Sequence, residues 1–222
     1  MIDMTENHLL GKSKNISVWK RIKDKLKHGL ILQVIRNQLA KIGIEITPYF
    51  WEREALGNDK PPEIKGDIKE YKLEYLGVDD MQYISDNARG NRKEILLDHL
   101  NEGKKCLGLK HHEEIVAFMW IDFKECDFRP NKHRLKSNEA YLSSMYTMES
   151  YRGMNIAPYL RYKCYGILNE MGIDTLYSVS EFFNSAAIKY KRKLGVKHQK
   201  LILFIGLFKK VRLSFTLKNY LK

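Results

Sequence analysis

The spacing of apolar residues changes character several times along the last two thirds of the chain. Short runs of alternating or continuous apolar residues predict strands, and apolar residues spaced three or four apart predict helices. The expected strands are 68–75, 105–110, 115–123, 139–148, 175–180 and 200–208, and the expected helices are 79–88, 92–102, 158–171 and 185–194. This order predicts a mixed α/β layer of about six strands.

The first part of the chain has a different pattern. Between residues 18 and 41, apolar side chains recur every three or four positions, which predicts a helix with one apolar and one strongly basic face. The apolar positions are Trp19, Ile22, Leu26, Leu30 and Val34. Such a helix either packs on the domain that follows or lies on an anionic membrane surface, and the pattern fits both.

Residues 44–54 are expected to be a short extended piece. The polar stretch Gly57 to Asp67, with adjacent prolines at 61 and 62, is typical of a linker. The pattern therefore predicts two parts, an N-terminal extension over residues 1–66 and a domain over residues 67–222.

Charge is unevenly spread along the 222 residues, whose formal net charge is +12. Residues 11–41 carry +8 and residues 182–222 carry +11, so the remaining residues sum to −7. Two basic ends around an acidic middle favour local anion sites or an anionic surface as partner. No recognisable motif interleaves aromatic and basic residues, so nucleic-acid binding is not expected.

Targeting and metal signals are weak. The longest apolar run, 201–208, is much shorter than the ~20 residues of a membrane-spanning helix, and the N-terminus does not resemble a secretory signal. We therefore expect a cytoplasmic protein.

The three cysteines, Cys106, Cys126 and Cys164, are widely spaced, which favours buried reduced thiols over a disulfide framework or a metal site.

The chemical signal lies where the strand 139–148 runs into a helix that contains Pro158 in its first turn. Proline is favoured there because the first turn makes no intrahelical use of its N–H. A strand, a loop containing Gly153 and a helix start together form an anion cradle, in which free N–H groups and the helix dipole attract negative charge. Arg152 adds a full positive charge, so the pattern predicts a phosphate or pyrophosphate site.

Two motifs resemble the GNAT N-acetyltransferase family. The family's acyl-CoA fingerprint is Arg or Gln, two residues, Gly, one residue, then Gly or Ala. Residues 152–157 (RGMNIA) match it at Arg152 and Ala157 but have Asn155 where the family prefers glycine. Asparagine tolerates a positive φ angle better than other non-glycine residues, so the loop can still form. Residues 184–196 (NSAAIKYKRKLGV) resemble the family's late helix, which begins with Asn and ends in Leu-Gly-aromatic.

The resemblance implies a GNAT-like mixed central sheet of about six to seven strands flanked by helices. It also implies an acyl-CoA-dependent N-acyltransferase, with acetyl-CoA as acyl donor and no metal. Met145, Tyr146 and Thr147 would pair their backbone with the pantetheine arm. The pyrophosphate would lie on Arg152, Gly153, Met154, Asn155, Ile156 and Ala157, and Asn184 would contact the cofactor.

The catalytic residues are less clearly marked. Glu139, at the entry of the central strand, is the candidate base because family members often carry a carboxylate near that strand. The family's usual Tyr position, seven residues after the Asn, is Lys191 here, and Tyr190 lies one step earlier. Tyr190 is the candidate acid, although one helical step turns it by about 100°. Lys191 would either stabilise a thiolate or contact nucleotide phosphates or water.

The acceptor expected from this reading is a small-molecule amine. The N-terminal extension weakly resembles GNAT-like proteins encoded with surface-polysaccharide enzymes, which favours an amino sugar or a sugar nucleotide near the inner membrane face. A non-catalytic acyl-CoA-binding or membrane-docking module of the same fold is the alternative, since Asn155 and Lys191 depart from the family pattern.

Overall fold

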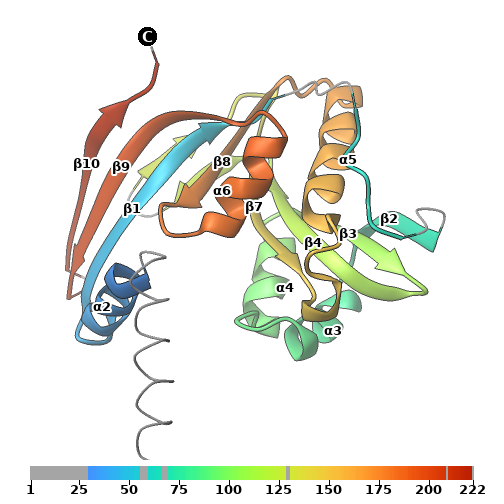
Figure 1. Cartoon of the computed structure of the whole chain (residues 1–222), viewed down its shortest axis with the longest axis horizontal. Coiled ribbons are helices and arrows are strands. Elements are labelled where there is room, and N and C mark those ends of the chain that lie inside the picture. Colours follow the sequence, from blue (N-terminus) through green and yellow to red (C-terminus); the bar gives the residue numbers. More distant parts are fainter. Residues whose placement is uncertain (1–29, 56–59, 67–69, 129–130, 209, 222) are drawn as a thin grey trace, which may run out of the picture. The chain divides into compact units, whose positions relative to one another are not determined.

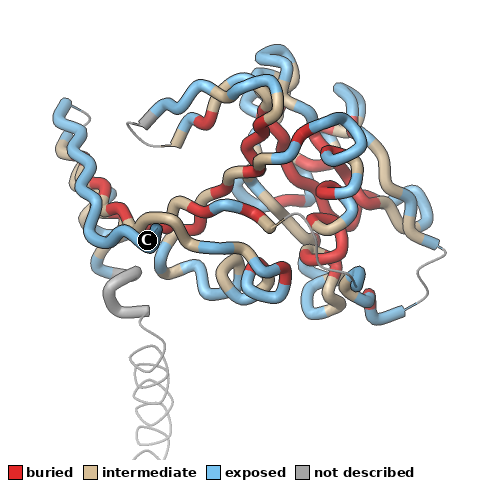
Figure 2. Tube along the Cα trace, turned by 90° about the horizontal axis from the view of Figure 1, so that it is seen from above, coloured by how far each residue is buried: buried red, intermediate tan, exposed pale blue. Residues whose placement is uncertain are grey.

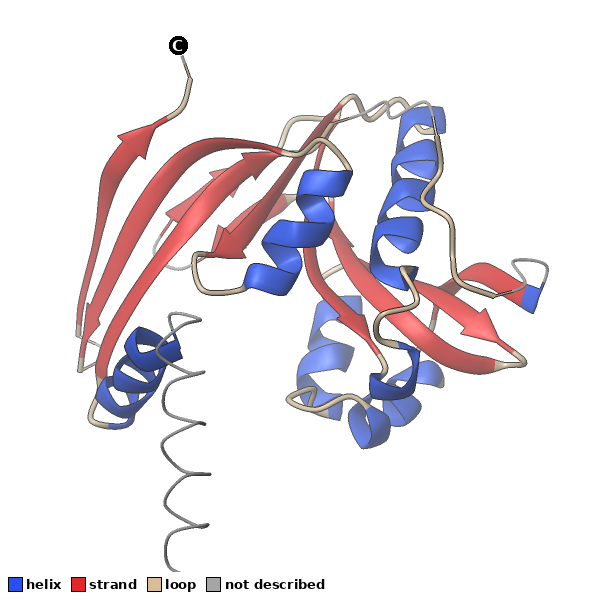
Figure 3. Cartoon of the chain, viewed as in Figure 1, coloured by secondary structure: helices blue, strands red, loops and turns tan. Residues whose placement is uncertain are grey.

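A computed structural model of the chain describes residues 30–55, 60–66, 70–128, 131–208 and 210–221. It contains both helices and strands (Figures 1 and 3). The helices are α2 (Leu30–Lys41), α3 (Asp80–Asn87), α4 (Lys93–Asn101), the 3-10 turn η2 (Glu149–Tyr151), α5 (Ile156–Glu170) and α6 (Ser185–Lys193). The strands are β1 (Ile44–Arg53), β2 (Tyr71–Leu76), β3 (Lys105–His111), β4 (Glu114–Asp122), β5 (Glu125–Phe128), β6 (Asn131–Arg134), β7 (Glu139–Thr147), β8 (Thr175–Glu181), β9 (Lys197–Leu207) and β10 (Val211–Asn219).

The strands form one mixed sheet and a separate hairpin. The sheet has eight strands in the order β10-β9-β1-β8-β7-β4-β3-β2, and β5 pairs with β6. Strands β2, β3, β4 and β7 are successively antiparallel, β7 and β8 are parallel, and β1 is antiparallel to β8. The expected mixed α/β class is confirmed. The sheet is larger than predicted because β1, expected only as a short extended piece, joins it, and because β10 was not predicted.

Two hydrophobic clusters cover the two faces of the sheet between β2 and β8. Alternate residues of a strand point to opposite faces, so Met119 of β4 packs toward α5, whereas Phe118 and Trp120 pack toward α3 and α4. In Figure 2 the buried residues (red) lie mostly on inner segments of the trace and the exposed residues (pale blue) mostly on outer ones. All three cysteines are buried free thiols, as expected.

Strand β7 has an irregularity that positions the functional site. Phe118 pairs with Tyr146 and Trp120 pairs with Ser143, so β7 carries one more residue than β4 across this interval. Ser144 takes a positive φ of 49° there. An extra residue of this kind is a β-bulge, which bends the strand. In the described part of the chain, β7 and β8 pair over 139–142 and 175–178, and beyond this the two strands separate.

Strand β1, which lies in the predicted N-terminal extension, is one of the strands of the sheet. By compactness the chain divides into two units, residues 1–47 with 204–213 and residues 48–203 with 214–222. The domain boundary after residue 66 stays a prediction. Residues 30–41 of the expected amphipathic helix are helical, while residues 18–29 lie outside the described residues. None of the helices in the described ranges is long and apolar enough to cross a membrane.

Candidate active site

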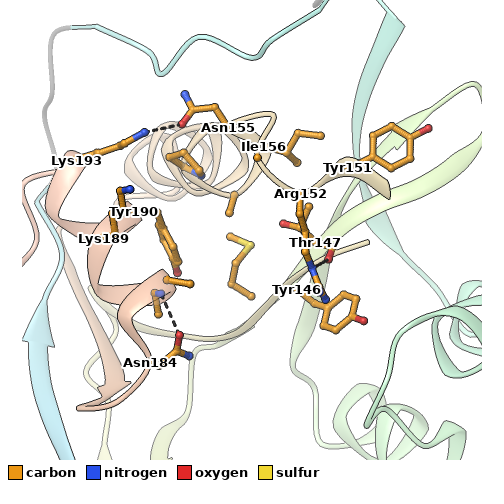
Figure 4. A pocket seen from close by; sticks show the side chains of 16 residues that line it. Tyr146, Thr147, Tyr151, Arg152, Asn155, Ile156, Asn184, Lys189, Tyr190 and Lys193 are labelled. Atoms are coloured by element: carbon orange, nitrogen blue, oxygen red, sulfur yellow. Dashed lines mark hydrogen bonds between the residues drawn. The ribbon is translucent and has the colours of Figure 1, made fainter. Parts of the chain in front are cut away.

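A cavity of about 500 Å³ lies where β7 and β8 separate (Figure 4). Its walls come from the end of β7, the loop that follows, the start of α5 and one side of α6. The lining residues are Met145, Tyr146, Thr147, Tyr151, Arg152, Gly153, Asn155, Ile156, Ala157, Pro158, Asn184, Ala186, Ala187, Lys189, Tyr190 and Lys193. Beyond Leu142, β7 pairs with β4 on one side, so its other edge presents backbone N–H and C=O groups toward this space.

The loop between η2 and α5 is held in shape by two residues with positive φ angles. Gly153 has φ 84° and Asn155 has φ 66°. The Asn155 amide donates to the backbone carbonyl of Glu63 at 2.7 Å, and its oxygen accepts from Lys193 Nζ at 3.1 Å. These bonds stabilise Asn155 in the left-handed conformation, which is far less favourable for a β-branched or bulky residue. The sequence interpretation of Asn155 as compatible with the loop agrees with this geometry.

Helix α5 begins at Ile156 without a side-chain cap on its first turn. The first N–H groups of a helix have no intrahelical partner and carry the positive end of the dipole. Arg152, Lys189 and Lys193 border the same cavity. An uncapped helix start beside three cations provides the donors and the charge that a diphosphate requires. The residues present therefore fit the pyrophosphate of an acyl-CoA.

The guanidinium of Arg152 lies along the end of β7. Its Nε donates to the Thr147 carbonyl at 3.2 Å, and its centre lies 5.6 Å from the centroid of the Tyr146 ring. Glu149 is 3.6 Å from Nη1. About half of the Arg152 side chain is exposed. The side chain is thus oriented by backbone and ring contacts while it keeps N–H groups for an anion.

Helix α6 forms the opposite wall. Asn184 is its N-cap, and its side-chain oxygen accepts from the Ala187 N–H at 3.1 Å, which explains why this helix begins with Asn. The Tyr190 ring projects from the helix toward the cavity (Figure 4). Burial raises the pKa of Tyr190 to about 12, so its hydroxyl remains protonated at neutral pH.

Lys191 points away from the cavity. Its ammonium donates to Glu52 at 2.7 Å, to Ser178 Oγ at 2.8 Å and to the Val179 carbonyl at 3.1 Å, and the residue is 4% exposed. The expectation that Lys191 contacts nucleotide phosphates, a thiolate or water was wrong. The error arose because the KYKRK run looked like a solvated basic face, whereas Glu52 of β1 and Glu54, which follows β1, lie on that side of α6.

Those two glutamates belong to a buried charge network beneath the cavity. Glu54 pairs with Arg161 at 2.5 Å and accepts a hydrogen bond from Tyr165. Burial alone would raise the pKa of Glu54, but the charges of Arg161 and Lys191 outweigh it and lower that pKa to about 2. The network contains two carboxylates, Glu52 and Glu54, and two cations, Arg161 and Lys191. Their buried charges therefore balance one another inside the protein.

Glu139 does not line this cavity. It lies at the first position of β7, opposite Thr175, and is 6% exposed. Its carboxylate accepts from the Lys136 N–H at 3.0 Å and from the Tyr177 hydroxyl at 3.3 Å. These contacts close the turn that leads into β7. The role of Glu139 as a base stays a prediction, and the geometry supplies it with a structural role.

A second cavity, of about 230 Å³, lies on the face of the sheet that α4 covers. It reaches the point at which β7 and β8 separate, because Ser143 and Ser144 from the bulge and Val179 of β8 line it. The other lining residues are His99, Lys104, Asp122, Asp127, Phe128 and Tyr141. The two cavities therefore approach the bulged part of β7 from opposite faces.

His99 is the titratable ring of this second cavity. It packs edge-on against Trp120, with ring centroids 4.9 Å apart. Burial and then the charge of Lys104 lower the pKa of His99, so the ring is neutral at physiological pH. Its Nδ1 is buried and lacks a hydrogen-bond partner among the described residues. A neutral imidazole can accept a proton.

The family model for the GNAT acetyltransferases matches residues 69–196. The chain belongs to the GNAT family. The match covers the strands β2 to β8, the helices α3 to α6, and both motifs identified in the sequence. No curated protein matches the chain.

Solved structures share the fold at low identity. An acetyltransferase from the GNAT family of Colwellia psychrerythraea is similar with a TM-score of 0.54 and 15% identity, over 76% of this chain and 59% of that one. A Drosophila protein is similar with a TM-score of 0.53 and 14% identity, over 81% and 57%. The chain thus spans less than three fifths of these two structures, and at such identities the likeness shows the fold alone.

The GNAT fold brings most of the predicted cofactor residues together. Met145, Tyr146, Thr147, Arg152, Gly153, Asn155, Ile156, Ala157 and Asn184 line the first cavity, as does Tyr190. Met154 does not: it packs against the hydrophobic cluster beneath α5, and its carbonyl accepts from the Lys65 N–H at 3.1 Å. Sequence reasoning missed His99, which in the sequence is one polar position of an ordinary amphipathic helix.

Proposed function

We propose that the protein is an acetyl-CoA-dependent N-acetyltransferase acting on a small amine. The observation that carries the proposal is the separation of β7 and β8, with the uncapped start of α5 and three cations on one face and a second cavity on the other. A donor and an acceptor that enter from opposite faces would meet at the bulge. Holding both reactants in one place supplies a large part of the rate in such reactions.

The donor side follows from the first cavity. Acetyl-CoA would supply the acyl group as a thioester that an amine can attack directly. The 152–157 loop and Arg152 would hold the diphosphate, and the free edge of β7 at residues 145–147 would pair with the amide-containing arm. Tyr190, kept protonated by burial, can donate a hydrogen bond to the departing thiolate.

The acceptor side follows from the second cavity. Its two aspartates, Asp122 and Asp127, attract an ammonium group, and the neutral His99 ring can take the proton that must leave before attack. A cavity of about 230 Å³ admits the reacting end of a small amine, an amino sugar included. We therefore propose His99 as a stronger candidate for the base than Glu139.

Thiol release from acetyl-CoA, measured against a panel of polyamines, amino sugars and amino-sugar nucleotides, tests this function. Turnover with at least one amine, abolished when the second cavity is filled by Ser143→Trp, is the expected result. If acetyl-CoA binds but no amine releases thiol, the non-catalytic acyl-CoA-binding module replaces this proposal. Failure to bind acetyl-CoA contradicts both.

A further inference from the structure

Three potential metal ligands converge at the far edge of the sheet. Glu70 directly precedes β2, His111 ends β3, and His112 begins the turn between β3 and β4. The Nε2 atoms of His111 and His112 lie 2.9 and 3.3 Å from the same oxygen, Glu70 Oε2. One ligand atom from each residue thus lies within 4.8 Å of the other two.

The backbone turn that joins the two histidines is unusual. His111 pairs with Glu114, and the two residues between them both have positive φ angles, 47° at His112 and 66° at Glu113. Glycine or asparagine is the ordinary choice at such turn positions. Successive side chains of a strand point to opposite faces, but this left-handed turn brings the His112 ring to the His111 ring, with centroids 4.2 Å apart.

The His111 ring is held in place by two tyrosines. It stacks on Tyr71 with centroids 4.7 Å apart, and its Nδ1 lies 3.3 Å from the Tyr151 hydroxyl. A metal-binding histidine usually has its second nitrogen engaged by a hydrogen bond, which fixes the ring and the tautomer. The Tyr151 contact supplies this feature, and it leaves Nε2 directed at Glu70.

We propose that Glu70, His111 and His112 form a binding site for a divalent transition metal of the zinc class. Two imidazole nitrogens and one carboxylate oxygen suit Zn²⁺, and with bonds of about 2.0 to 2.2 Å the ligand atoms of a tetrahedral site lie roughly 3.3 Å apart. The Glu70–His contacts of 2.9 and 3.3 Å need little adjustment to reach that spacing. The side chains of His112 and Glu70 are 68% and 46% exposed, so water can complete the coordination.

Binding would displace protons from the site. Each imidazole must present an unprotonated Nε2 to the metal, so metal binding competes with protons for these nitrogens. The site is independent of the acyltransferase proposal, because none of its three ligands lines either cavity. Tyr151 both lines the first cavity and contacts His111 of this site.

Zinc chloride titrated into the full, untagged chain against a chromophoric chelator tests the proposal, with Co²⁺ absorption as a second readout. The wild-type chain is expected to bind one equivalent, and His112→Asn, which suits the positive φ angle, and Glu70→Gln are each expected to bind at least tenfold more weakly. His133→Asn is the matched control and should bind like wild type. Equal binding by wild type and His112→Asn, or loss in the control, overturns the site.

Discussion

The ammonium of Lys191 in α6 lies 2.7 Å from a carboxylate oxygen of Glu52 in β1, although 139 positions separate the two residues. Both side chains are almost fully inside the protein. This pair connects β1 to the helix that carries Tyr190. It also orients α6, because a helix that directs Lys191 toward β1 directs Tyr190, the preceding residue, toward the cavity.

Lys191→Met should destabilise the protein strongly. Removing one partner of a buried ion pair leaves an uncompensated charge and typically costs roughly 3 to 5 kcal/mol. Urea unfolding measures the change. The double variant with Glu52→Gln should recover part of the loss, and Lys189→Met, at an exposed position of the same helix, should change stability by less than about 0.5 kcal/mol. A harmless Lys191→Met would contradict the buried network.

Acid should weaken the fold through Glu54. Its pKa is about 2 in the folded protein against an ordinary value of 4.5, so the folded state favours the charged form. The stabilisation is complete above pH 4.5 and is lost as pH falls from there toward 2. Urea unfolding at pH 7, 4 and 3 should show this decline. In Glu54→Gln the same pH range should have a shallower slope, and an unchanged slope would exclude Glu54 as the source.

Arg152→Ala should weaken coenzyme A binding. Loss of one charge-assisted contact to a phosphate costs about 1.5 to 3 kcal/mol, which corresponds to a roughly 10- to 150-fold rise in Kd. Calorimetry with coenzyme A measures it. Arg192→Ala is the matched control, because Arg192 is exposed on α6 and does not line the cavity. Equal affinities for wild type and Arg152→Ala would remove Arg152 from the site.

Tyr190→Phe should lower kcat and leave coenzyme A affinity nearly unchanged. The phenyl ring keeps the packing of Tyr190, while the hydroxyl that would bond the departing thiolate is lost, which we expect to cost about 100-fold in kcat. Because the pKa of Tyr190 is raised to about 12, wild type should show no loss of rate from its ionisation up to pH 10. Tyr162→Phe, in α5 and outside the cavity lining, serves as control. Equal kcat values for wild type and Tyr190→Phe would exclude the role.

The identity of the base is decided by comparing His99→Gln with Glu139→Gln. The pKa of His99 is lowered, so the wild-type rate should fall only when pH drops below about 6.5 and the ring becomes protonated. His99→Gln should lose most of the rate and this acid limb, whereas Glu139→Gln should stay within about twofold of wild type. A loss confined to Glu139→Gln, greatest at low pH, would return the role to Glu139.

The features predicted correctly from sequence are those that short segments determine. The strand, loop and helix around residues 139–171 follow from local periodicity, and Asn184 marks a helix start through its own side chain. The order of the helices and strands from β2 to β9 follows in the same way, apart from the β5–β6 hairpin, which was not predicted. The resemblance to a known family then gave the fold class.

The features that were missed depend on residues far apart in the chain. From sequence alone, Lys191 is expected at the surface, because nothing local shows that β1 lies beside α6. Strand β1 itself pairs with β8, more than 120 positions away. Glu70 joins His111 across 41 positions. His99 has no motif, and its chemistry arises from Trp120 and Lys104, which the sheet brings to it.

The place of β1 between β8 and β9 also affects how the chain is made. During synthesis, β1 leaves the ribosome early, and both of its partners follow more than 120 residues later, since β1 ends at Arg53 and β8 begins at Thr175. At the ~5 to 20 residues per second of translation, the strand would wait for roughly 6 to 24 seconds with two unpaired edges. Open strand edges invite pairing with other chains. Nascent chains stalled before residue 175 should therefore depend on chaperones more than the completed protein does.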